Sequence, residues 1–119
     1  MKKIVESAPG SKGVILMGFD GIAVEQYVRP EFADAMDIES MAMEFSFRFL
    51  ELRDAAGSLA MGAITDITLK AQYGTVVVRV LSNEYFVAMV LGDASNMGKS
   101  RWLLRSNAQA ISADLFTVG

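Results

Sequence analysis

Residues 75–91, TVVVRVLSNEYFVAMVL, contain two short strands joined by a turn. In TVVVRVL, residues 75–81, apolar side chains alternate onto both sides of the strand, and YFVAMVL, residues 85–91, is also apolar on both sides. A strand with two apolar faces needs cover on both. The three residues between the strands permit only an antiparallel connection. This stretch therefore predicts the centre of an antiparallel sheet that lies between helices.

A third strand is predicted just before this pair, at residues 60–69, AMGAITDITL. It alternates weakly, and the turn Gln72-Tyr73-Gly74 separates it from residues 75–81. Because the strand begins a new run after a helix, we expect it at an edge of the sheet. An edge strand that is not blunted by Pro or charge can pair with its own copy. The pattern therefore predicts self-association along residues 60–69.

A hairpin is predicted near the N-terminus. Residues 13–18, GVILMG, and 22–29, IAVEQYVR, flank Asp20-Gly21. An Asp-Gly pair between apolar runs indicates a primed turn, which needs positive φ at both central residues. Residues 1–7 leave room for no more than a short helical turn before this hairpin.

A long amphipathic helix is predicted over residues 31–56, with Gly57 ending it. Its apolar arc is about 200° wide, whereas a surface helix usually needs about 100° to meet its core. The excess includes Phe and Met side chains, and Met suits an adaptable protein contact. A second helix is predicted to start at Ser95 or Asn96, either of which can cap it. The fold class is therefore α+β, one domain over residues 1–119, with a five-stranded antiparallel sheet in a three-layer sandwich.

Composition excludes several classes of function. The chain has 119 residues, no Cys, no His and a net charge of −3. Disulfides, thiolate chemistry and Ser-His-Asp triads are thereby excluded, and an acidic chain is a poor nucleic-acid binder. Nothing resembles a signal peptide or a membrane span. We predict a cytoplasmic protein with no catalytic residues, no cofactor, no metal and no membrane insertion.

One motif offers an enzyme-class alternative, a nucleotide-binding protein that uses the loop Gly92–Ser100, GDASNMGKS. A phosphate-binding loop that ends in Gly-Lys-Ser at 98–100 requires Gly at 93, and this chain has Asp93. We interpret the segment as a loop followed by a helix start. The nearby Lys99, Arg101 and Arg105 suit an acidic partner surface.

The helix and strand patterns together predict an isologous dimer, in which residues 60–69 pair with their symmetry mates and the long helices lie side by side. The residues predicted for this interface are apolar or lie on one face of the strand: Met61, Ala63, Thr65, Ile67, Met43, Phe47 and Leu50.

The order of these segments resembles the roadblock/dynein-light-chain family. The resemblance is carried by FDGIAV (19–24), GAITDITL (62–69), TVVVRVL, YFVAMVLG and NMGKSR (96–101), and it covers residues 13–115. Within the family, the bacterial MglB-like branch is the most similar. The chain departs from the family in its short N-terminus, since members usually begin with a helix of several turns.

The resemblance implies a profilin-like sandwich, a homodimer with a continuous sheet, and a platform for a small Ras-like GTPase in signalling or cell polarity. It implies a regulator, GTPase-activating or adaptor, with a motor-associated light chain as the alternative within the family. The partner surface it implies lies on the long helix: Asp34, Asp37, Met41, Glu44 and Arg48.

Overall fold

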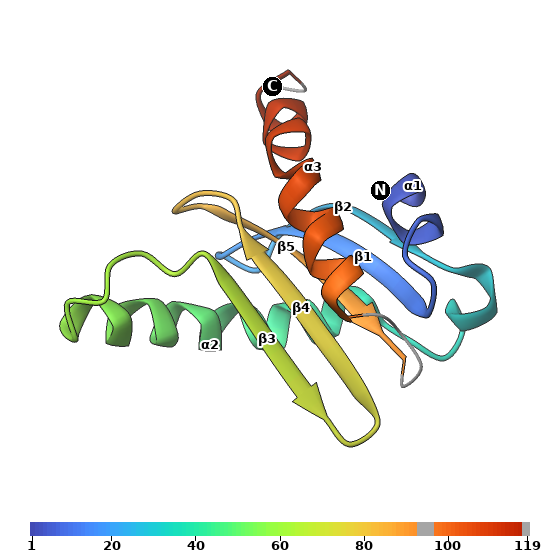
Figure 1. Ribbon diagram of the computed structural model, residues 1–119, viewed down its shortest axis with the longest axis horizontal. Coiled ribbons are helices and arrows are strands. Elements are labelled where there is room, and N and C mark those ends of the chain that lie inside the picture. The colour runs from blue at the N-terminus through green and yellow to red at the C-terminus, as the bar shows by residue number, and fades with distance from the viewer. Residues whose placement is uncertain (93–96, 118–119) are drawn as a thin grey trace.

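The computed structural model describes residues 1–92 and 97–117, with side chains through Gly92 and from Gly98 to Ile111. Five antiparallel strands form one sheet in the order β2-β1-β5-β4-β3 (Figure 1). The elements are α1 (Lys2–Glu6), β1 (Ser11–Gly18), β2 (Ala23–Val28), a 3-10 turn (Pro30–Phe32), α2 (Ile38–Ser58), β3 (Asp66–Ala71), β4 (Gly74–Val80), β5 (Tyr85–Leu91) and α3 (Met97–Thr117). This architecture confirms the predicted α+β class and the sheet with helices on its faces.

The central strands are buried on both faces, as their sequence predicts. On one face Val77, Val87 and Met89 pack with side chains of α1 and α3. On the other face Phe86 and Ala88 pack with side chains of α2. The sheet is therefore the middle of three layers, and β3 and β2 form its two edges.

Phe86 sets how α2 lies on the sheet. Its ring is 5.1 Å from that of Phe19 and 5.3 Å from that of Phe49, which meets it edge-on. Phe49 shares a buried stripe of α2 with Ile38 and Ala42. Aromatic pairs at these distances add directional attraction to the burial of their area. This contact selects which of the helix's apolar stripes faces the core, a choice the sequence leaves open.

The hairpin β1–β2 is confirmed, but its predicted primed turn is wrong. The Gly21 N–H donates to the Gly18 carbonyl at 3.0 Å, and only Gly21 of the two central residues has positive φ, at 86°. Asp20 instead accepts the Ile22 N–H at 3.0 Å. A three-residue loop that ends in a left-handed Gly fits these bonds. Asp20 therefore fixes the turn through its side chain rather than through a left-handed backbone.

The long helix begins and ends later than predicted. Pro30 starts the separate 3-10 turn, and α2 begins at Ile38, where the Asp37 carboxylate accepts the Ser40 N–H at 3.1 Å and the Ser40 hydroxyl at 2.7 Å. At the other end, Gly57 continues the helix through Ser58. Side-chain capping by Asp satisfies a helix N-terminus, and this cap rather than Pro30 decides the start.

The strand predicted at residues 60–69 is also corrected, because β3 begins only at Asp66. Ala60 and Gly62 have φ of 57° and 83°, left-handed values that an extended strand does not use. Residues 60–65 are therefore a loop between α2 and β3. The edge position that the sequence predicts applies to the shorter β3.

The short N-terminal segment forms α1 and packs into the core. Ile4 and Val5 are buried against the same face of the sheet as α3. The guanidinium of Arg29 donates to the carbonyls of Val5 at 2.7 Å and Ser11 at 2.5 Å, and so joins α1 to the sheet. A five-residue helix has little stability of its own, so these bonds and the two buried side chains hold it in place.

The orientation of α2 predicts different costs for two nearby Phe residues. Phe49 is 2% exposed and Phe47 is 53% exposed. We expect Phe49→Ala to lower the free energy of unfolding by about 3–5 kcal/mol through cavity formation. Phe47→Ala should cost less than about 1 kcal/mol. Urea unfolding of both variants at equal protein concentration checks this, and equal losses would mean that α2 docks through another stripe.

Candidate interaction surface

The free edge of β3 presents a complete row of backbone hydrogen-bonding groups. The Val80 N–H donates to the Thr65 carbonyl at 2.9 Å, and Asp66 is aligned with Arg79 in the β3–β4 ladder. In an antiparallel pair, residues alternate between bonding their neighbour and pointing away from it. The alternation therefore directs the N–H and C=O groups of Asp66, Thr68 and Lys70 away from β4. No described strand lies on that side of β3.

On the α2 side of the sheet, this edge is apolar. Ile67 is half-buried and Leu69 is 38% exposed, and their ladder partners Val78 and Val76 belong to the core beneath α2. Ile64 from the preceding loop lines a small recess with Ile67. The apolar surface therefore continues from the core to the outermost strand.

On the α3 side, the edge is charged. The Asp66 carboxylate is 3.1 Å from Arg79. Asp66 also lines a shallow groove together with Arg101, Trp102 and Arg105 of α3. Trp102 is 53% exposed. Arg101 and Arg105, two of the three basic residues that the sequence analysis predicts for contact with an acidic partner, line the same groove. Positive side chains predominate around a single paired carboxylate.

The pKa of Asp66 is lowered by its neighbours. Burial raises the pKa of this carboxyl group, but hydrogen bonds from Thr65 and Arg79, together with the charges of Arg79 and Arg101, outweigh burial. The pKa of Asp37 is lowered as well, first by the backbone hydrogen bond from Ser40. The ionised carboxylates of Asp37 and Asp66 therefore stabilise the folded chain relative to the unfolded one.

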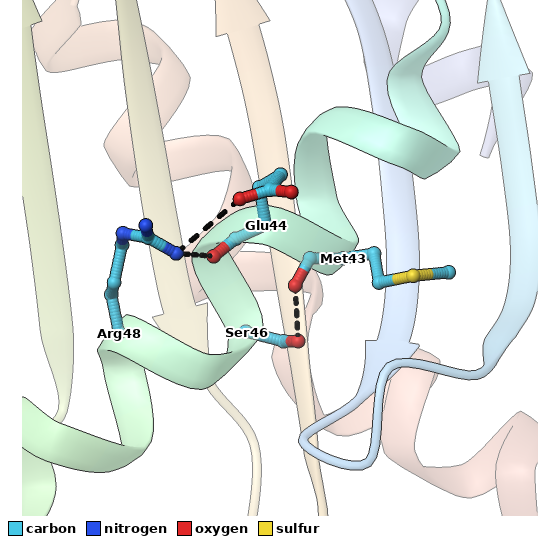
Figure 2. Close-up of polar contacts among 4 residues, drawn as sticks. All are labelled: Met43, Glu44, Ser46 and Arg48. Carbon is cyan, nitrogen blue, oxygen red and sulfur yellow. Dashed lines mark hydrogen bonds and ion pairs between the residues drawn. The ribbon is translucent and has the colours of Figure 1, made fainter.

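The outer side of α2 is polar with exposed apolar side chains among the charges. Arg48 lies 3.4 Å from the Glu44 carboxylate, and its guanidinium also donates to the Glu44 carbonyl at 2.8 Å (Figure 2). Figure 2 also shows that Arg48 and Met43 extend to opposite flanks of the helix, Arg48 on the side of β3 and β4 and Met43 on the side of β1. The Met43 side chain lies beside Gly21, where an added Cβ would be 3.3 Å from its Cγ.

The structure divides the residues predicted for the dimer interface. Ile67 lies on β3, whereas Met61, Ala63 and Thr65 lie in the loop before it, and Met61 is 73% exposed. Of the three helix residues of the set, Met43 lies beside Gly21 and Leu50 lines a groove with Gly18 and Asp20, so both are on the flank of α2 that faces the β1–β2 hairpin. Phe47 is 53% exposed on the side away from the sheet. A contact through β3 therefore does not bring the whole set together.

The residues predicted for the partner surface are not all equally accessible. Asp34 and Asp37 are exposed before α2, and Glu44 and Arg48 are exposed on it. Met41 is half-buried and packs against the core beneath α2. Met41 is therefore a poor surface probe, because a charge there would disturb the packing of the helix.

The predicted interface leaves out three residues, Thr68, Leu69 and Lys70, which the structure places on the exposed edge strand. It also misses Leu52, which helical spacing places on the Arg48 flank and which is 46% exposed. The alternation D-I-T-L-K, polar at 66, 68 and 70, is the signal that marks the strand. The predicted interface set is drawn from the whole predicted strand over 60–69, and so it includes residues of the loop before β3.

The opposite edge, β2, is a less suitable pairing strand. Its ladder with β1 shifts register between Leu16 and Met17. Residues 33–37 also lie beside it, where they line a groove together with Gln26, Tyr27 and Val28. Bulges and covering segments protect an edge from further pairing.

The described residues offer little support for the other kinds of site. Among residues 1–92 and 97–117, no three acidic side chains gather closely enough to hold a metal ion. The centre of the Gly92–Ser100 loop, together with Ser95 and Asn96, lies outside the described residues. No helix in the described part of the chain has the length and apolarity to cross a bilayer.

These features define a three-layer α+β protein with one long helix over one face and an open, half-apolar edge strand. No family profile and no curated protein matches the sequence. Solved structures do match. MglC from Myxococcus xanthus shares 29% identity with a TM-score of 0.67, over 96% of this chain and 94% of that one.

Two further structures superpose more closely at lower identity. A roadblock/LC7 domain from Streptomyces avermitilis has 15% identity and a TM-score of 0.82, over 98% of this chain and 94% of its own. The gliding protein MglB from Thermus thermophilus has 10% identity and a TM-score of 0.83, over 94% of this chain and 82% of its own. The chain therefore has the fold of the roadblock/LC7 domain, and MglC and MglB are among the proteins whose structures resemble it.

The lowered pKa values predict acid sensitivity. Such a carboxyl group has a lower pKa in the folded chain than in the unfolded chain, where the pKa is about 4. It stabilises the fold at pH values above the unfolded pKa, and this stabilisation is lost as the pH falls through the folded pKa. We expect the melting temperature to fall below about pH 4. Asp66→Asn should be less stable than the native chain at pH 7 and approach it at about pH 3.

Thermal unfolding between about pH 3 and pH 7 measures this difference. Asp54→Asn is the control, because Asp54 is exposed and forms no ion pair among the described residues. A gap between Asp66→Asn and the native chain that does not narrow on acidification would contradict the assignment.

Proposed function

We propose that this protein is a homodimeric, non-enzymatic regulator or scaffold of a small Ras-like GTPase, acting in cytoplasmic signalling or cell polarity. The observation that carries the proposal is the open edge of β3, with free backbone groups and an apolar face next to α2. Pairing of two such edges extends one sheet through both copies and places two α2 helices on the same side of it.

The self-association step follows from the physical chemistry of the edge. Unpaired N–H and C=O groups on an exposed strand favour pairing with another strand. Such pairing would cover two exposed apolar side chains: Leu69 on β3 and Leu52 on the flank of α2 that carries Arg48. Leu59 at the end of α2 is 70% exposed and extends that surface.

The GTPase step rests on the family resemblance and on the outer stripe of α2. Helical spacing places Ser40, Glu44, Phe47 and Glu51 on the side away from the sheet, and all four are exposed. This stripe combines acidic groups with an exposed Phe. Such a stripe suits a protein contact better than a helix face that carries only polar side chains.

Thr68→Pro tests the dimer. The Thr68 N–H points away from β4, so Pro removes a donor from the free edge and none from the β3–β4 ladder. We expect loss of the dimer, measured by analytical ultracentrifugation, with an unchanged circular dichroism spectrum.

Gln26→Pro is the matched control for this test. The Arg29 N–H donates to the Lys12 carbonyl at 2.9 Å, so alternation directs the Gln26 N–H to the free edge of β2. This variant should remain dimeric. A Thr68→Pro protein that stays dimeric would reject β3 as the interface.

Phe47→Asp tests the partner surface. We expect binding to a small Ras-like GTPase to weaken about tenfold or more, because an interface core tolerates a charge poorly, while the dimer remains. Binding is measured by interferometry against purified small GTPases of the source organism, each loaded with GDP or with a non-hydrolysable GTP analogue.

Lys3→Glu serves as the control, because Lys3 is exposed on α1, across the sheet from α2. It should bind the GTPase as the native chain does. If no GTPase binds the native dimer in either nucleotide state, the regulatory role is rejected. If Phe47→Asp becomes monomeric, Phe47 belongs to the self-interface.

A further inference from the structure

The short strand β3, Asp66-Ile67-Thr68-Leu69-Lys70-Ala71, carries opposite charges at positions equally distant from Thr68. We propose that two copies pair antiparallel in one register centred on Thr68, and that Asp66 of each copy meets Lys70 of the other. This pairing selects a second copy of this chain over other strands. The inference rests on the proposed dimer and specifies its register and its selectivity.

The backbone limits the registers that a two-fold pairing can use. The groups that point to the free edge belong to Asp66, Thr68 and Lys70, so each must meet one of these same three positions in the second copy. Centring the pair on Thr68 matches all three at once. Every other permitted register leaves at least one of them beyond the end of the overlap.

Charge distinguishes the registers further. A pair centred on Asp66 or on Lys70 would place like charges opposite each other, which is destabilising. A pair centred on Ile67 or Leu69 would place Thr68 opposite a charged residue and leave the other charge unmatched. Only the register centred on Thr68 places opposite charges across the interface, twice by symmetry.

The two faces of the sheet agree with this register. Asp66 and Lys70 share the α3 side with their ladder partners Arg79 and Thr75, and Ile67 and Leu69 share the α2 side. In the proposed pair, Ile67 therefore meets Leu69 of the second copy on the α2 side.

Asp66 and Lys70 are both accessible for an ion pair between two copies. Arg79 holds the Asp66 carboxylate at 3.1 Å and leaves it 37% exposed. Lys70 is exposed and forms no ion pair with any residue that the structure describes. The Asp66 carboxylate has acceptor sites for both cations. A second copy thus supplies the partner that Lys70 lacks within its own chain.

Cysteine cross-linking tests the register, and the chain contains no Cys that would interfere. Opposed residues in this type of pair have Cα atoms about 5.5 Å apart, which a disulfide spans. We expect Thr68→Cys alone to form a covalent dimer under mild oxidation, read on a non-reducing gel.

Two further variants complete the cross-linking test. Lys70→Cys alone should remain uncross-linked, because its two copies would lie about 13 Å apart along the strands. A mixture of Lys70→Cys with Asp66→Cys should cross-link. Efficient cross-linking of Lys70→Cys with itself, or none by Thr68→Cys, would overturn the register.

Charge exchange tests the selectivity. Lys70→Asp and Asp66→Lys should each weaken the homodimer about tenfold, because each opposes like charges twice. An equimolar mixture should form a heterodimer, and the double variant should regain the homodimer. Native mass spectrometry measures the dimer in the two single variants, their mixture and the double variant, and circular dichroism checks that each is folded. Lys3→Asp, on α1, is the control.

The outcomes separate this inference from the proposed dimer. Failure of the mixture and of the double variant to recover dimerisation would overturn the charge pairing while the dimer stands. A native chain that is monomeric at all concentrations would overturn the dimer and the register together.

Discussion

The whole arrangement depends on strands that are apolar on both faces. β5 and its neighbours bury side chains above and below the sheet, so the structure requires a helix layer on each side. The helices cover the central strands first, because the most apolar surface lies there. The consequence is that β3, the strand at the end of the sheet, extends beyond this cover with Thr68, Leu69 and Lys70 exposed.

The contact of Phe86 with Phe19 and Phe49 turns a broad apolar helix into one with two distinct flanks. The sequence predicts that α2 has more apolar surface than the sheet covers, and exposed Phe47 and Leu52 agree with that expectation. It does not predict the rotation of the helix, because several stripes are similarly apolar. That rotation depends on the ring contacts with Phe86, which join residues far apart in the chain.

The same distinction explains where the predicted site and the structure diverge. The β1–β2 hairpin, the antiparallel β4–β5 pair and the double cover follow from local pattern, and the structure has all three, whereas the pairing of β1 with β5 joins segments far apart in the chain. The boundaries of α2 and β3 depend on individual groups, the Asp37 cap and the left-handed Ala60 and Gly62. An alternation of polar and apolar residues cannot reveal a backbone that turns at Ala60. The predicted interface therefore included loop residues and omitted the centre of the strand.

An open edge carries a risk of indiscriminate pairing, and the composition of β3 limits that risk. A strand of six residues with Asp66 and Lys70 on one face opposes like charges or leaves a charge unmatched when it pairs with its own copy in any register but the one centred on Thr68. In the proposed dimer, Ile67 and Leu69 on the α2 side supply the apolar attraction, and Asp66 and Lys70 on the α3 side supply the discrimination. Because these two functions lie on opposite faces of one strand, each can be altered without the other. In the proposed pairing, a change in the charges of β3 alters which copy the chain accepts and leaves the fold as it is.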